Sequence, residues 1–299
     1  MPLNLPFSVV IPVYNEEATI EDVIKNLKDC LNNKKLNYEI VCVNDGSTDN
    51  SLNIMKRIPD ITLVNHLQNR GMGAAIKSGI LAAKHDVIIT FDADGQHFPE
   101  DIPRLLNEYE KEEDMIIGAR KITNTFYNRI PGKIFLKYMS SYLFKQDIQD
   151  LNSGLRLFNR KIIKKFFIFC SDRFSFSTSS TLCYYAFGMN VKYVPIETKI
   201  REKGKSHVNY RAGLKTIMKI IQIAMIFQPL RVMAPIVLLF LFFTIFSLTK
   251  DLISANLSDS TVLFFCVTII LSVFALLSEQ LRTIRLEIMN FEYQKRDES

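Results

Sequence analysis

One stretch of this sequence runs from a short apolar segment directly into two carboxylates: Val87-Ile88-Ile89-Thr90-Phe91-Asp92-Ala93-Asp94-Gly95-Gln96-His97. Its β-branched residues predict a buried strand over 87–91. Two carboxylates at one strand end repel each other unless a cation or a proton intervenes. Oxygen ligands of this kind suit Mg²⁺ or Mn²⁺. We therefore expect Asp92 and Asp94 to hold a divalent metal, although carboxylates in a solvated turn are the commoner origin of an Asp-x-Asp pair.

The sequence around this stretch alternates between two periods. Short β-branched runs predict strands over 7–11, 39–43, 61–65 and 115–117. Apolar residues at helical spacing predict helices over 17–31, 51–58, 73–84 and 99–109. This alternation indicates an α/β fold in which helices cover both faces of a Rossmann-like, mostly parallel sheet. Ligands bind such sheets at the carboxyl ends of the strands.

The pattern loosens after residue 120. We expect a polar loop over 121–129, a helix rich in Phe, Tyr and Met over 134–144, a strand over 191–195 and a basic loop over 201–210. The segment 211–227 places its apolar and basic side chains on different sides of a helix. We interpret it as a juxtamembrane helix lying on a bilayer, with an ordinary amphipathic core helix as the alternative.

A second polar motif, Asn44-Asp45-Gly46-Ser47-Thr48-Asp49, directly follows the strand predicted over 39–43. These residue types are common in turns, and Ser47, Thr48 or Asp49 is expected to cap the next helix. A carboxylate at a strand end also accepts hydrogen bonds from a base N–H or a ribose hydroxyl. We therefore expect Asp45 to face a ligand while the later residues cap.

The hydropathy of the chain is unevenly distributed. The mean hydropathy is +0.09 although 23% of the residues are charged, and the stretches 232–249 and 260–278 contain no charged side chain. A membrane span needs about 17–25 apolar residues. We therefore predict two spans, with buried core helices as the alternative for each stretch.

The flanks of these stretches predict an orientation. Four basic residues precede the first span (Arg211, Lys215, Lys219, Arg231) and four follow the second (Arg282, Arg285, Lys295, Arg296). The connection 250–259 holds one Lys and two Asp. By the positive-inside rule, the large domain and the C-terminal tail are expected in the cytoplasm. The apolar N-terminal stretch is interrupted by Pro6 and Pro12, so we expect no signal peptide.

Composition excludes some classes of function. The net charge of +6 is modest. The basic residues concentrate beside the predicted spans, a distribution that suits binding to anionic lipid better than binding to nucleic acid. No motif indicates a nucleic-acid partner. The five cysteines form no C-x-x-C pair, so we expect reduced thiols and no metal site built from them.

Together, the motifs resemble those of a known enzyme family. Pro12-x-Tyr14-Asn15-Glu16, Asn44-Asp45-Gly46-Ser47-Thr48-Asp49 and Asp92-Ala93-Asp94-Gly95-Gln96-His97 resemble the motifs of family-2 inverting glycosyltransferases of GT-A fold. Asp150-x-x-Ser153-Gly154-x-Arg156, Arg201-x-x-Gly204-x-Ser206 and the two apolar stretches narrow this resemblance. The chain is similar to dolichyl-phosphate mannose synthases and to bacterial polyprenyl-phosphate glycosyltransferases over nearly its whole length.

The resemblance implies roles for individual residues. Those expected to hold the nucleotide sugar are Pro12, Tyr14, Glu16, Val43, Asp45, Asp92, Ala93, Gln96 and Arg120. Those expected at the Mg²⁺ or Mn²⁺ are Asp92, Asp94 and Gln96, and those expected at the acceptor phosphate are Arg129, Arg201, Lys205 and His207. Family members often have Lys where this chain has His207, so His207 and Lys205 stay alternatives. Asp150 and Arg201 match catalytic positions, and Asp150 is either a base or an orienting group.

The function that this resemblance implies is an inverting, metal-dependent transfer of sugar from a nucleoside diphosphate to a polyprenyl phosphate, such as undecaprenyl or dolichyl phosphate. It implies a multi-pass protein of the bacterial inner membrane, and a homo-oligomer is compatible with the sequence. The expected regions are a GT-A catalytic domain over 1–210, the juxtamembrane helix over 211–231, the membrane hairpin over 232–278 and a cytoplasmic tail over 279–299. The alternatives are a processive polysaccharide synthase, disfavoured by the absence of Trp, and a non-catalytic membrane scaffold.

Overall fold

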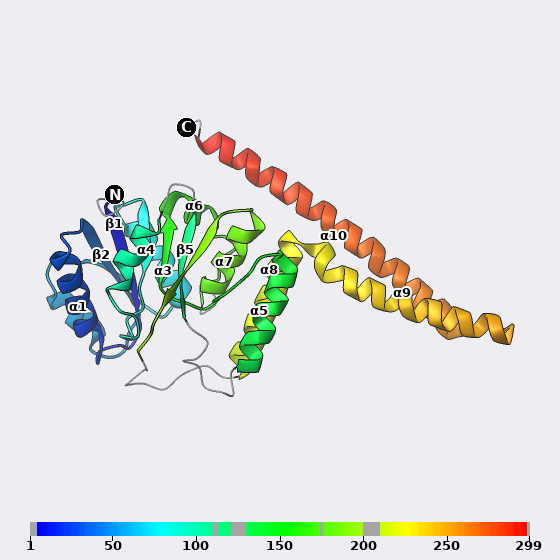
Figure 1. Ribbon diagram of the computed structural model, residues 1–299. Helices are drawn as coiled ribbons and strands as arrows, with labels where there is room; N and C mark the ends of the chain where they lie inside the picture. Colours follow the sequence, from blue (N-terminus) through cyan, green and yellow to red (C-terminus); the bar gives the residue numbers. More distant parts are fainter. Residues whose placement is uncertain (1–4, 110–112, 121–129, 174–175, 200–209, 298–299) are drawn as a thin grey trace. The chain divides into compact units, whose positions relative to one another are not determined.

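The computed structural model describes residues 5–109, 113–120, 130–173, 176–199 and 210–297. It divides into two compact units (Figure 1). The first consists of Met1–Ser141 with Gln146–Lys219, and the second of Tyr142–Lys145 with Ile220–Ser299. The division therefore falls inside a helix, nine residues beyond the domain boundary expected at residue 210.

The first unit contains the α/β fold that the sequence predicts. Its strands are β1 (Phe7–Val13), β2 (Tyr38–Asp45), β3 (Thr62–His66), β4 (Val87–Thr90), β5 (Met115–Arg120), β6 (Arg156–Asn159) and β7 (Val191–Ile196). Its helices are α1 (Ile20–Asn33), α2 (Ser51–Arg57), α3 (Met72–Ala82), α4 (Asp101–Asn107), α6 (Arg160–Lys165) and α7 (Phe176–Ala186). The helices α5 (Ile130–Phe144) and α8 (Tyr210–Phe227) each contribute residues to both units.

The described strands form one sheet in the order β3-β2-β1-β4-β6-β5-β7. Strands β1, β2, β3 and β4 are parallel, with Ile11 opposite Cys42 and Val9 opposite Ile89. The expected mostly parallel sheet is thus confirmed. Parallel neighbours end at one edge, so the segments after β1, β2 and β4 lie together there.

Strand β6 is the exception in this sheet. It pairs antiparallel with both β4 and β5, with Arg156 opposite Thr90 and Ile117. The start of β6 consequently lies at the edge where the parallel strands end. The sequence pattern does not predict β6, α6 or α7, because a four-residue strand and a helix rich in Ser and Thr give little periodic signal.

The apolar core follows the predicted helical spacing. Helix α1 buries Ile20, Val23, Ile24, Leu27 and Leu31, which recur at three- and four-residue intervals. They join one cluster with residues of β1, β2 and β4. Helix α3 packs on β1 and β2, where a Cβ added at Gly79 would overlap the Val10 side chain. This packing holds the ends of β1, β2 and β4 in fixed positions.

The second unit contains two long apolar helices, α9 (Pro229–Ser254) and α10 (Asp259–Asp297), which lie side by side (Figure 1). Within the described residues, Pro229–Ser254 and Asp259–Glu287 are long and apolar enough to cross a membrane. Polar pairs join the two helices in antiparallel order, from Thr244 with Thr268 at 3.1 Å to Asp251 with Thr261 at 2.6 Å. Helix α10 continues unbroken beyond residue 278, after which a cytoplasmic tail is expected from the sequence.

Candidate active site

The predicted motifs after β1 and β2 interlock at the carboxyl edge of the sheet. The Asn15 amide donates to Ser47 Oγ at 3.1 Å, and the Thr48 amide donates back to Asn15 Oδ1 at 2.8 Å. Asn15 adopts a φ of 54°, and the polar side chain of an Asn tolerates this left-handed conformation. The turn is therefore built largely by side chains of the two motifs, while the neighbouring Tyr14 is 45% exposed.

The start of α2 refines the capping prediction. The N-cap residue is Asn50, whose own side chain makes no capping hydrogen bond. Asp49 instead accepts from the Ser51 amide through Oδ1 at 3.0 Å and from the Glu17 amide through Oδ2 at 3.0 Å. Of the three capping candidates, Asp49 satisfies the first amide of the helix while also tying α2 to the segment after β1.

Asp45, at the end of β2, is only 2% exposed. Its Oδ1 accepts from His66 Nδ1 at 2.8 Å and from the Arg70 amide at 2.9 Å, and its Oδ2 accepts from the Gly71 amide at 2.8 Å. His66 Nε2 lies 2.9 Å from Ser78 Oγ on α3. Because the carboxylate accepts from Nδ1, this nitrogen carries a proton, and in a neutral ring Ser78 then donates to Nε2. Asp45 thus holds the turn that leads into α3.

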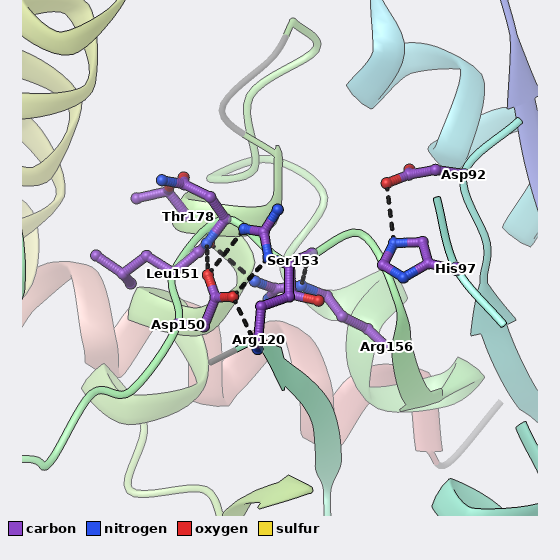
Figure 2. A network of polar contacts seen from close by, with 9 residues as sticks. Asp92, His97, Arg120, Asp150, Leu151, Ser153, Arg156 and Thr178 are labelled. Atoms are coloured by element: carbon purple, nitrogen blue, oxygen red, sulfur yellow. Dashed lines mark hydrogen bonds and ion pairs between the residues drawn. The ribbon is translucent and has the colours of Figure 1, made fainter. Parts of the chain in front are cut away.

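Asp92 follows β4, and its side chain is 25% exposed. His97 Nε2 lies 3.2 Å from Asp92 Oδ2 (Figure 2). Burial alone would raise the pKa of Asp92, but the hydrogen bond with His97 and the nearby charges of Arg120 and Arg156 outweigh it and lower this pKa. His97 is 5% exposed, and its Nδ1 has no hydrogen-bond partner among the described residues. Asp92 is consequently held as a carboxylate.

The residues after β4 fit a divalent cation by their donor chemistry. Asp92, Asp94 and Gln96 offer two carboxylates and an amide oxygen within one half-buried turn, in which Asp94 Oδ1 accepts from the Gln96 amide at 3.1 Å. Hard cations prefer such oxygen ligands. Within the described ranges, no group of three His, Cys, Asp or Glu side chains gathers to form a complete site. A metal here would need substrate oxygens or water as further ligands, as Mg²⁺ usually does.

Asp150 lies in the segment before β6 and is joined to Arg120, the last residue of β5. Arg120 Nε donates to Asp150 Oδ2 at 2.8 Å, and Arg120 Nη2 donates to Oδ1 at 3.1 Å (Figure 2). The Asn152 amide also donates to Oδ1, at 2.9 Å. Burial alone would raise the pKa of Asp150, but the hydrogen bonds and charge of Arg120 lower it. Asp150 is therefore an ionised, tightly oriented carboxylate.

The loop that carries Asp150 also touches Asp92. A Cβ added at Gly154 would overlap the carboxylate group of Asp92. Gly is thus the residue that lets the 150–155 backbone approach the first carboxylate after β4. Thr90 Oγ1 donates to the Gly154 carbonyl at 2.6 Å, which fixes this approach from β4. The segments carrying Asp92 and Asp150, far apart in sequence, form one site because β6 runs antiparallel between β4 and β5.

A further contact connects the turn after β4 to the segment after β7. His97 and Thr198 form an isolated antiparallel bridge, and the Lys199 amide donates to the Gln96 carbonyl at 2.9 Å. Lys199 therefore lies beside the expected metal-binding turn. Arg129, Arg201, Lys205 and His207 lie outside the described residues.

The structure brings the other predicted residues to this edge. Pro12, Tyr14, Glu16, Val43, Asp45, Asp92, Ala93, Asp94, Gln96, Arg120 and Asp150 all lie at or just after the ends of β1, β2, β4 and β5, or immediately before β6. Val43 is fully buried and Ala93 is 4% exposed, so a ligand would meet their backbone. Sequence reasoning missed His66, Ser78 and Thr178, whose partners are distant in sequence. His97 and Arg156 lie within the predicted motifs, but the sequence alone assigns them no role.

Comparisons with known proteins identify the family of this chain. The sequence profile described as "Glycosyl transferase family 2" matches residues 8–167. The chain is 27% identical to the UDP-N-acetylglucosamine–dolichyl-phosphate N-acetylglucosaminyltransferase of Methanococcus voltae, over 73% of this chain and 95% of that protein. It is 30% identical to the undecaprenyl-phosphate 4-deoxy-4-formamido-L-arabinose transferase of Shewanella sediminis, over 77% of this chain and 70% of that protein.

Among solved structures, glucosyl-3-phosphoglycerate synthase of Mycobacterium tuberculosis, crystallised with Mn²⁺ and UDP, superposes with a TM-score of 0.61. The match covers 74% of this chain and 80% of that chain at 15% identity, which shows a shared fold. The matched profile spans more than half of the sequence, including the segments after β1, β2 and β4 and the loop carrying Asp150. The chain is a member of glycosyl transferase family 2.

Proposed function

We propose that this protein transfers a sugar from a nucleoside diphosphate to a polyprenyl phosphate. The observation that carries the proposal is that the carboxylate Asp92 and the loop of the carboxylate Asp150 meet at one edge of the sheet. The same chain contains two helices that are apolar enough to cross a membrane. A water-soluble donor and a lipid acceptor need such a combination. The relatives named for dolichyl-phosphate and undecaprenyl-phosphate transferases support this acceptor class.

The donor is expected along the carboxyl ends of β1, β2 and β4. Tyr14 and the turn pinned by Asp45 would hold the nucleoside, and Asp92, Asp94 and Gln96 would hold the diphosphate together with Mg²⁺ or Mn²⁺. When bound, this cation would neutralise charge on the departing diphosphate. The Asp92 carboxylate would be ready for this role, since the buried His97 holds it in one orientation through their hydrogen bond.

The transfer itself is a displacement at the anomeric carbon of the sugar. A phosphate oxygen of the acceptor forms the new bond to this carbon on the face opposite the leaving group. The bond from the carbon to the diphosphate oxygen breaks, and its electron pair stays on the nucleoside diphosphate, so the configuration inverts. An acceptor phosphate is already largely ionised near pH 7, so this step needs no strong base. Asp150 then acts as the group that orients Arg120.

The experiment that tests the proposal is a donor screen. Purified protein is incubated with radiolabelled nucleotide sugars and undecaprenyl phosphate, and the lipid product is identified by mass spectrometry. We expect one donor class to yield a glycosylated lipid phosphate, and we expect EDTA to abolish the product. Asp94→Ala should be inactive, while Asp86→Ala, at a 64% exposed carboxylate just before the start of β4, should retain activity. No labelled lipid with any donor, or full activity in EDTA, would refute the proposal.

We further propose that both spans cross the membrane with the first unit and the C-terminus in the cytoplasm. The protein should stay in the membrane fraction after a high-salt wash. An Asn256→Cys variant, in the exposed connection between α9 and α10, should react with an impermeant maleimide in intact cells. The matched Asn53→Cys variant, on α2, should react only after lysis. If the Asn53→Cys variant is labelled in intact cells and the Asn256→Cys variant is not, the orientation is the opposite of the one proposed.

A further inference from the structure

Arg156, the first residue of β6, is an unusual buried charge. It is 1% exposed and is among the largest fully buried side chains of the described chain. Arg is almost never fully buried unless it is paired with an acid, because an unpaired buried charge is costly. None of the ion pairs between described residues includes Arg156. Its burial therefore calls for an explanation other than a salt bridge.

The guanidinium hydrogen bonds to neutral oxygens. Nε donates to the Ser153 carbonyl at 2.7 Å, and Nη2 donates to the Leu151 carbonyl at 2.9 Å (Figure 2). Nη1 donates to Thr181 Oγ1 at 2.6 Å and to Ser180 Oγ at 3.4 Å, both on α7. The planar fork thus holds two carbonyls of the Asp150 loop and anchors them to a helix. A Lys side chain has the charge but lacks this fixed set of donors.

These bonds act on the part of the loop that orients Asp150. The two carbonyls flank Asn152, whose amide donates to Asp150 Oδ1 at 2.9 Å. The Asn152 side chain accepts from Thr178 Oγ1 at 3.0 Å, which adds a second connection to α7. The next two carbonyls, of Gly154 and Leu155, accept from Thr90 Oγ1 and from the Gly118 amide. The loop is therefore held by hydrogen bonds along its length, and Arg156 provides those to its middle carbonyls.

The charge of Arg156 also lies close enough to the carboxylates to influence them. Burial lowers the pKa of Arg156 to about 10, so the side chain stays charged at neutral pH. Asp150 and Asp92 both favour this charged form, and Arg156 in turn contributes to lowering the pKa of Asp92. One buried cation thus lies behind both anionic centres of the site.

We propose that Arg156 is a positioning residue for the transfer: its guanidinium holds the Leu151 and Ser153 carbonyls so that Asp150 is presented to Arg120 in the geometry the reaction uses. The catalytic part of this inference rests on the proposed function. The loop-holding part stands on the contacts alone. A role restricted to overall stability is the competing explanation, and it predicts no selective effect on the loop or on turnover.

The chain offers a matched control in Arg160, at the start of α6. This side chain also donates to two backbone carbonyls, of Ile80 and Leu81, both at 3.1 Å, but it holds α3 rather than the Asp150 loop. Arg156→Lys and Arg160→Lys therefore remove the same kind of fork from two places while retaining the charge. Comparing them separates loop positioning from general stabilisation.

The test measures both variants in two ways. In hydrogen exchange without substrates, we expect the 150–155 peptide to exchange faster in Arg156→Lys and at the wild-type rate in Arg160→Lys. In transfer assays, we expect Arg156→Lys to lower kcat by about 100-fold, as small misplacements of catalytic groups do, with little change in donor KM. Arg160→Lys should keep the wild-type kcat. Wild-type exchange of the 150–155 peptide, or equal kcat in both variants, would overturn the proposal.

A milder variant covers the case in which Arg156→Lys does not fold. Thr181→Val removes one acceptor of the guanidinium and should lower kcat by about tenfold, as expected for one hydrogen bond to a charged group. An unchanged kcat in this variant would count against the inference. If the wild type transfers no sugar in any assay, the proposed function fails, while the exchange comparison still decides whether Arg156 holds the loop.

Discussion

Asp150 accepts two parallel hydrogen bonds from the guanidinium of Arg120, with nitrogen–oxygen distances of 2.8 and 3.1 Å, so the last residue of β5 and the loop before β6 act as one unit. Such bidentate pairs are stronger and more directional than single contacts. Both oxygens of Asp150 are already engaged, and its pKa is lowered chiefly by Arg120 against the effect of burial. A carboxylate in this state is a weak base. The geometry therefore favours the orienting role for Asp150 of the two that the sequence leaves open.

The pair should behave as one unit in a double-mutant cycle. We expect Asp150→Asn and Arg120→Gln each to lower kcat by at least about tenfold, because each leaves its partner misdirected or buried without a counter-ion. The double variant should be no worse than the poorer single variant, since the interaction is lost only once. Transfer rates of all four proteins measure this coupling. Additive losses would show that the two residues act separately.

The pair should also make stability depend on pH. The folded-state pKa of Asp150 is lowered, so its contribution is fully present above the unfolded-state value, about 3.9, and is lost as pH falls through the folded value. Asp150→Asn should therefore be less stable than wild type at pH 7, and the difference should shrink below about pH 4. Thermal unfolding in detergent across this range measures it. The control Asp86→Asn, at an exposed carboxylate, should follow the wild-type curve.

Gly154 should tolerate no side chain. In Gly154→Ala the new Cβ would displace the carboxylate of Asp92, so we expect Mn²⁺-dependent nucleotide binding to weaken by at least about tenfold. Isothermal titration with UDP and GDP measures this binding. Gly188→Ala is the control: its φ of 68° is unfavourable for Ala, costing about 1 kcal/mol, but the new Cβ meets nothing within 4 Å. It should lose a little stability and retain binding. Equal binding by both variants would contradict the role of Gly154.

His66 should affect the donor more than turnover. In His66→Phe, Asp45 loses its Nδ1 donor, so the turn at 70–71 loosens and we expect the donor KM to rise by about tenfold with a smaller change in kcat. Ser78→Ala should shift KM in the same direction to a lesser degree. Steady-state kinetics with varied donor test both. His85→Phe, whose imidazole lies outside this network, is the control. A fall in kcat at constant KM would contradict this assignment.

Much of this protein was predictable from local sequence. Short β-branched runs predict β1 to β5 and β7, because strands covered on both faces are apolar along their length. Helical spacing predicts the helices between the parallel strands, because each buries one apolar stripe. The two apolar helices followed from the absence of charge. Asp92, Asp45 and Asp150 were found because a strand end or a family motif marks them within a few residues.

Only the tertiary structure decided how these residues are connected. The position of Asp45 at a strand end predicts that it faces a ligand, yet its carboxylate accepts hydrogen bonds from His66, Arg70 and Gly71. Local sequence does not predict these contacts, because the donors come from another strand and its following turn. Arg156 looks like an ordinary motif residue, and the role proposed for it depends on the hydroxyls of α7, a helix without a periodic signal. Local patterns record which face of an element is apolar. They do not record which distant donor meets which acceptor, because strand order and the reversal of β6 set those pairings.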